Sequence, residues 1–222
     1  MIAEILNIFL HVDQNLLFLA QNYGSVVYGL LFLVIFFETG LVVTPFLPGD
    51  SLLFAAGALS GAGLLNAFFL FISLSIASIL GDTLNYWVGN SVGARVFTEK
   101  SRFFKKEYLQ MTEKYYHEHG GKTIIFARYI PIIRTFAPFV AGIGNMKYSR
   151  FLWFNILGGI TWVAVWVFGG YFFGSIPFVK AHFSLFTLLI MIVSLLPFPI
   201  EMITKELRKR RKSRISNLKK YY

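Results

Sequence analysis

Residues 36–61 read FFETGLVVTPFLPGDSLLFAAGALSG, and this stretch decides how the chain can sit in a membrane. It is apolar enough for a bilayer, yet it contains two acidic residues and two prolines: Glu38, Asp50, Pro45 and Pro48. The apolar run that leads into it, Val26–Phe37, has only 12 residues, whereas a spanning helix needs about 20. Pro48-Gly49 stops any helix before a second apolar run begins.

The pattern therefore predicts two short helical arms joined by an irregular elbow, which is a re-entrant element. Irregular backbone exposed to lipid is not tolerated at that depth, because its polar groups find no hydrogen-bond partners there. We expect the elbow to be buried in protein or to line a wet cavity.

The composition indicates a membrane protein throughout. Of the 222 residues, 56% are hydrophobic and 14% are charged, whereas a soluble domain has about 25% charged residues. We predict an all-α polytopic membrane protein with a single domain. The chain has no cysteine, which excludes disulfides and thiolate metal sites.

Apolar and charged runs divide the chain into three parts. In residues 1–22, apolar and polar residues alternate at roughly helical spacing, which predicts an amphipathic interfacial helix. The membrane domain, 23–204, is predicted to contain two re-entrant loops, at about 26–65 and 121–146, and three spanning helices, at about 66–97, 150–174 and 183–203. Residues 205–222 form a basic tail.

Basic residues indicate the orientation. Of 21 Lys and Arg, nine lie between Lys205 and Lys220 and seven between Arg95 and Lys122, so both segments are predicted to be cytoplasmic. Anionic lipid headgroups would attract these charges, and we prefer this partner to nucleic acid. The second loop then enters from the cytoplasm and the first from outside. The side of the N-terminus stays open.

The second loop resembles the first in its pattern. Residues 123–146 read TIIFARYIPIIRTFAPFVAGIGNM, an apolar run that contains Arg128, Arg134, Pro131 and Pro138. Paired interrupted segments inserted from opposite faces are typical of inverted-repeat transporters, which bind their substrate near the midplane. The residues expected at the elbows are Pro45, Pro48, Gly49, Pro131 and Pro138.

Four charges lie in otherwise apolar sequence: Glu38, Asp50, Arg128 and Arg134. Each costs at least ~2.5–3.5 kcal/mol at the centre of a bilayer, so we expect them to meet one another or to face water. Two guanidinium groups can bind a phosphate, with helix N-termini near Ser51 and Thr135 adding positive potential. The acids would then exchange protons. Ion pairs that merely fix the elbows are the alternative.

Asp82 is a weaker candidate. It shares a predicted helix face with Asn85, Tyr86 and Gly89, and it is either a second proton site or part of a packed polar cluster. Gly142 and Gly144 are expected to allow close helix packing. His117 and His119 are two residues apart and point in different directions on a helix, so we expect no metal site there.

Three motifs together resemble the DedA family of bacterial membrane proteins, also called the SNARE-associated or VTT-domain family. They are Glu38-x-Gly40, the FLPGD segment that ends at Asp50, and Arg128-x-x-Pro131-x-x-Arg134-Thr135. The resemblance extends over nearly the whole chain. It implies a bacterial cytoplasmic-membrane protein with two opposed re-entrant loops, in which Glu38, Asp50, Arg128 and Arg134 are the functional charges.

The resemblance also implies lipid transport. The chain is expected to be a flippase of lipid phosphates, either undecaprenyl phosphate or a phospholipid, coupled to the proton-motive force. The alternatives are a proton-coupled exporter of small solutes or cations and a scaffold for the cell envelope that transports nothing. No nucleophile triad, P-loop, cofactor motif or metal cluster is visible, so we expect no enzymatic activity. A homo-oligomer is compatible with the sequence.

Overall fold

A computed structural model describes residues 12–41, 49–93 and 119–174, together with positions 110, 113, 116, 117, 176 and 179. In this part of the chain every regular element is helical, in agreement with the all-α prediction. The elements are α2 (Val12–Tyr23), α3 (Val26–Gly40), α4 (Gly49–Gly61), α5 (Ala67–Val92), η2 (Gly120–Lys122), α7 (Thr123–Ala127), α8 (Pro131–Ile143) and α9 (Tyr148–Phe173).

Several predicted features lie outside the described residues. They are Pro45, Pro48, the helix at 183–203, the basic tail and the first 11 residues. The predicted interfacial helix overlaps α2 only from Val12 onward.

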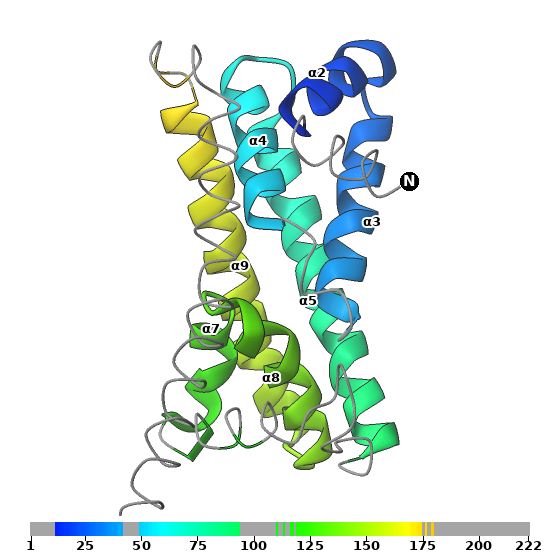
Figure 1. Cartoon of the computed structure of the whole chain (residues 1–222), viewed down its shortest axis with the longest axis vertical. Coiled ribbons are helices and arrows are strands. Elements are labelled where there is room, and N and C mark those ends of the chain that lie inside the picture. The colour runs from blue at the N-terminus through cyan, green and yellow to red at the C-terminus, as the bar shows by residue number, and fades with distance from the viewer. Residues whose placement is uncertain are drawn as a thin grey trace, which may run out of the picture.

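Two helices, α5 and α9, are long and apolar enough to cross a membrane. Each has 26 residues, or about 39 Å of helix, against a hydrocarbon core of about 30 Å. Figure 1 shows both running nearly the full height of the molecule. An exposed apolar stripe follows α5 at every fourth position, as contact with lipid requires: Phe68, Ile72, Ile76, Leu80, Leu84, Val88 and Val92.

The other apolar helices are shorter. α3 has 15 residues, and α4 and α8 have 13 each, which correspond to about 20–23 Å and do not reach across the hydrocarbon core. α3 and α8 pack along α5, whereas α4 and α7 pack along α9. In Figure 1, α4 occupies the upper half of the molecule and α7 and α8 the lower half.

Glycines bring the backbones together in the same way in both halves. In the pair α4–α9, a Cβ on Gly57 would overlap the carbonyl oxygen of Val167, and one on Gly170 would overlap that of Phe54. In the pair α8–α5, a Cβ on Gly142 would overlap the carbonyl oxygen of Tyr86, and one on Gly89 would overlap that of Phe139. On each helix the glycine lies three residues after the residue whose carbonyl oxygen the partner helix's glycine approaches. The two helix crossings therefore share one sequence spacing.

This packing predicts different effects for two neighbouring glycines of α9. Gly170→Ala is expected to destabilise the protein by about 1–3 kcal/mol, because the new methyl group would overlap the α4 backbone. Gly169 has no atom within 4 Å of its built Cβ, so Gly169→Ala serves as the matched control and should be neutral or slightly stabilising. Thermal unfolding in detergent measures both; equal effects would contradict the packing argument.

The helix starts differ from those expected. α4 begins at Gly49 and α8 at Pro131, rather than near Ser51 and Thr135. A proline is favoured at the first helical position because its missing N–H would have no helical partner there. Pro138 is not an elbow: it lies inside α8, which continues through it to Ile143. Gly144 caps the end of α8 and is exposed, so only Gly142 packs closely as predicted.

Candidate functional site

Buried charges gather halfway along the two long helices. Asp82 lies near the middle of α5, and Asn155 and Trp162 lie on either side of the middle of α9. The end of α3 brings Glu38 to this level, the start of α4 brings Asp50, and α8 brings Arg134. Five helices therefore contribute to one polar region inside an otherwise apolar bundle.

The first cluster is centred on Arg134, and we call it the Arg134 triad. The guanidinium forms an ion pair with Glu38, and its Nη1 lies 3.1 Å from Asp50 Oδ1. The Glu38 side chain is fully buried, whereas those of Arg134 and Asp50 keep about a tenth of their surface exposed. A guanidinium with two fixed donor directions suits this bridge between two carboxyl groups.

Gly49 allows Glu38 to reach its place. The backbone N–H of Gly49 donates to the Glu38 carboxyl group, and a Cβ on Gly49 would overlap that group. Asp50 is in the first turn of α4, where the helix dipole stabilises negative charge. The turn that follows Pro48 therefore positions both acids of the triad.

Trp162 completes the surroundings of the triad. Its indole Nε1 donates to Asp50 Oδ1 at 2.9 Å, and the Arg134 Cζ lies 5.6 Å from its ring centroid, in cation–π range. The side chain is 1% exposed. One aromatic residue of α9 thus contacts both an acid and the base of the triad.

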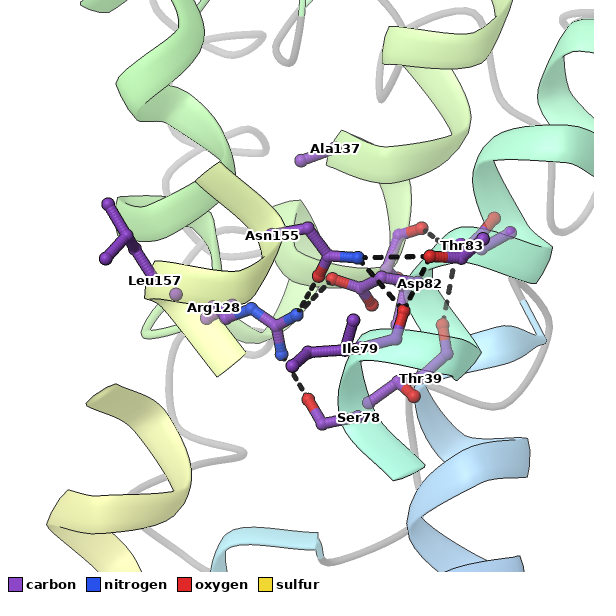
Figure 2. A network of polar contacts seen from close by, with 12 residues as sticks. Thr39, Ser78, Ile79, Asp82, Thr83, Arg128, Ala137, Asn155 and Leu157 are labelled. Carbon is purple, nitrogen blue, oxygen red and sulfur yellow. Dashed lines mark hydrogen bonds and ion pairs between the residues drawn. The ribbon is translucent and has the colours of Figure 1, made fainter. Parts of the chain in front are cut away.

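The second cluster is centred on Arg128, which follows α7. Its Nη2 lies 2.6 Å from Asp82 Oδ2 and 2.5 Å from Asn155 Oδ1, and its Nη1 donates to the hydroxyl of Ser78. Figure 2 shows the guanidinium pointing toward these three side chains. We call this group the Arg128 cage.

Further bonds hold the cage. Asn155 Nδ2 donates to the carbonyl oxygen of Ile79 at 3.0 Å and to the hydroxyl of Thr83 at 3.3 Å (Figure 2). Gly158 allows Arg128 to approach α9, since a Cβ there would lie 3.0 Å from Arg128 Nε. Three polar side chains bind Arg128, and one of them is a carboxyl group. Arg134 is bound by two carboxyl groups.

A small cavity joins the two clusters. It has a volume of about 10 Å³, which is room for about one water molecule. Its lining includes both arginines and comes from α3, α5, α8 and α9 as well as the turn after α7: Thr39, Asp82, Arg128, Arg134, Thr135 and Trp162. Two guanidinium groups thus face one space, which is too small for a phosphate in this conformation.

Asn85 links three helices beside this cavity. Its Nδ2 donates to the carbonyl oxygens of Thr39 at 3.2 Å and of Thr135 at 2.8 Å. α3 and α8, which carry Glu38 and Arg134, are therefore tied to the same residue of α5. The predicted helix face of α5 is buried: Asp82, Asn85, Tyr86 and Gly89.

The structure sorts the predicted charges into new pairs. Arg134 pairs with Glu38 and Asp50, as expected of charges on the two interrupted segments. Arg128 instead pairs with Asp82. Sequence reasoning missed Ser78, Asn155 and Trp162. Asn155 is the one amide side chain in the apolar helix α9, and the sequence contains this signal. No cluster of three or more potential metal ligands occurs among the described residues.

Comparison with known proteins gives one domain and several relatives. Residues 47–172 match the VTT domain. The chain is 48% identical over 206 residues to Protein DedA of Escherichia coli K12, covering 91% of this chain and 94% of that protein. It is 43% identical to the uncharacterized membrane protein Rv0364 of Mycobacterium tuberculosis H37Rv, covering 79% and 78% of the two chains.

A more distant relative is named for its location. The inner membrane protein YghB of Escherichia coli K12 is 36% identical over 162 residues, covering 71% of this chain and 73% of that protein. No solved structure matches the chain.

Proposed function

The chain belongs to the DedA family of VTT-domain membrane proteins, and from this premise we propose that it is a proton-coupled flippase of lipid phosphates in the bacterial cytoplasmic membrane. The observation that carries the proposal is the Arg134 triad, in which one guanidinium binds two carboxyl groups deep in an apolar bundle. A phosphate group presents two oxygens in a similar way and can replace the carboxyl groups on the guanidinium.

We propose further that α3–α4 and α7–α8 are the two opposed re-entrant elements, with the basic tail in the cytoplasm. The short helices and the repeated glycine crossing support this topology. α4 packs on α9 as α8 packs on α5, which is the relation that an inverted repeat would produce. Anionic headgroups would bind the tail.

Charge balance suggests how protons enter the cycle. The two clusters contain three carboxyl groups, Glu38, Asp50 and Asp82, against two guanidinium groups. A phosphate that binds Arg134 adds negative charge to a buried site, where uncompensated charge is costly. Protonation of Glu38 and Asp50 removes that excess. The acids release their protons when the phosphate leaves and they bind Arg134 again.

The lipid chain need not enter the site in this mechanism. The headgroup passes the polar region in the middle of the bundle while the hydrocarbon chain stays in the bilayer. The cavity between the arginines must widen for this passage, since it now has room for about one water. The membrane potential can contribute about 2.3 kcal/mol per charge per 100 mV. Undecaprenyl phosphate and phospholipids are the proposed substrates, and no bond of the substrate is broken.

Reconstitution in lipid vesicles tests this function. Vesicles would carry a fluorescent polyprenyl phosphate or phosphatidic acid, and transfer between leaflets would be followed with and without a pH gradient. We expect protein-dependent transfer that the gradient accelerates. The corresponding polyprenyl alcohol, which lacks the phosphate, is the control. Transfer no faster than in protein-free vesicles, or equal transfer of the alcohol, would overturn the proposal.

A further inference from the structure

Trp162 touches both partners of the bond that the proposed transport cycle breaks. Its Nε1 donates to Asp50 Oδ1, the same oxygen that Arg134 Nη1 approaches at 3.1 Å. The centroid of its ring lies 5.6 Å from the Arg134 Cζ, in cation–π range. We propose that Trp162 is a positioning residue of the headgroup site, an inference that rests on the proposed function and deepens it.

The ring orients Arg134 for an anion. The π electrons of the ring attract the guanidinium, while Nη1 and Nη2 donate to carboxyl oxygens at the same time. Arg134 uses two of its nitrogens on Glu38 and Asp50 in this way. When a phosphate replaces those acids, the ring still holds the guanidinium in place.

The indole N–H has a second task, which is to retain Asp50. When the phosphate displaces Asp50 from Arg134, the bond from Nε1 remains available to the carboxyl group. Asp50 then stays at the edge of the cavity that Trp162 itself lines, and it can return to Arg134 when the headgroup leaves. Trp162 therefore acts through Asp50 and Arg134 without taking up a proton.

Trp166 provides a matched control on the same helix. It lies one turn beyond Trp162, is half-buried, and packs against the apolar core around Leu53 and Val163. Its Nε1 has no hydrogen-bond partner in the part of the chain that the structure describes. The change from Trp to Phe is thus chemically the same at both positions, but only at 162 does it remove a bond to the triad.

The transport experiment compares these two variants in the vesicle assay with the fluorescent lipid phosphate. Trp162→Phe should lower the transfer rate at limiting lipid about tenfold, the size expected for loss of a hydrogen bond to a charged group. Trp166→Phe should stay within about twofold of the unchanged protein. Equal rates for the two variants in active vesicles would overturn the role of Trp162 and leave the function standing.

A fluorescence experiment separates the two claims. One protein retains only Trp162 and another only Trp166, with the remaining tryptophans replaced by Phe. Asp50→Asn, and separately the addition of decyl phosphate, should change the emission of the Trp162 protein and not that of the Trp166 protein. If Asp50→Asn leaves the emission of the Trp162 protein unchanged, the positioning role is overturned. If the protein without substitutions moves no lipid in the vesicle assay, the proposed function is overturned.

Discussion

Arg134→Lys is expected to reduce lipid-phosphate transfer by about 100-fold or more while the protein still folds. Lysine keeps the positive charge and can still pair with one acid, so the buried site stays compensated. It has no planar fork, and it cannot bind Glu38 and Asp50, or two phosphate oxygens, in the geometry that the triad uses. Loss of one such buried charged contact costs about 2–5 kcal/mol. Since about 1.4 kcal/mol corresponds to a tenfold change in affinity, a loss of about 100-fold or more is expected.

The measurement is transfer in vesicles at equal protein content, with thermal unfolding in detergent as the check of folding. Arg150→Lys is the control, because Arg150 is exposed in the first turn of α9. A scaffold that only needs an ion pair would tolerate Arg134→Lys. Transfer that survives this change within about threefold would argue that the arginine serves structure alone.

Arg128→Met is expected to destabilise the protein by about 3–5 kcal/mol, the cost of leaving one member of a buried ion pair without its partner. Asp82 would then be buried beside Ser78 and Asn155 without a cation. Adding Asp82→Asn removes the uncompensated charge and should restore most of the stability. Transfer of lipid phosphate should remain impaired in the double variant, because one of the two guanidinium groups that line the cavity is missing.

Thermal unfolding of both single variants and the double variant completes the cycle. Lys122→Met is the control for loss of a positive charge, since Lys122 is exposed. A double variant as unstable as Arg128→Met would show that the shape of the cage, and not its charge balance, determines stability. A double variant with full transfer would remove Arg128 from the headgroup site.

The helical class, the two long apolar helices and a helix that starts just before Asp50 follow from local signals in the sequence. The apolar runs predicted at about 66–97 and 150–174 overlap α5 and α9, because a helix in lipid must satisfy its own backbone, although α5 ends at Val92. The prediction of an elbow at Pro138 was wrong. A proline favours a helix break locally, but α8 packs along α5 and stays helical through Pro138.

Charge pairing was only half predictable. The cost of buried charge requires that each acid and base find a partner, but it does not say which one. Arg134 lies in α8 opposite α3 and α4, whereas Arg128 lies six residues earlier, beyond a helix break, and faces α5. The sequence does not distinguish Trp162 from the other tryptophans of α9. Its contacts with Asp50 and Arg134 appear only in the folded structure.

The proposed exchange of Glu38 and Asp50 for a phosphate on Arg134 changes the protonation of these acids, which infrared difference spectroscopy detects. Decyl phosphate would be added to the detergent-solubilised protein, with decanol as the control. The carbonyl stretch of protonated carboxyl groups is expected to grow on binding, and Glu38→Gln should remove part of this gain. Binding of the phosphate with no change in the carboxyl bands would contradict the proposed exchange.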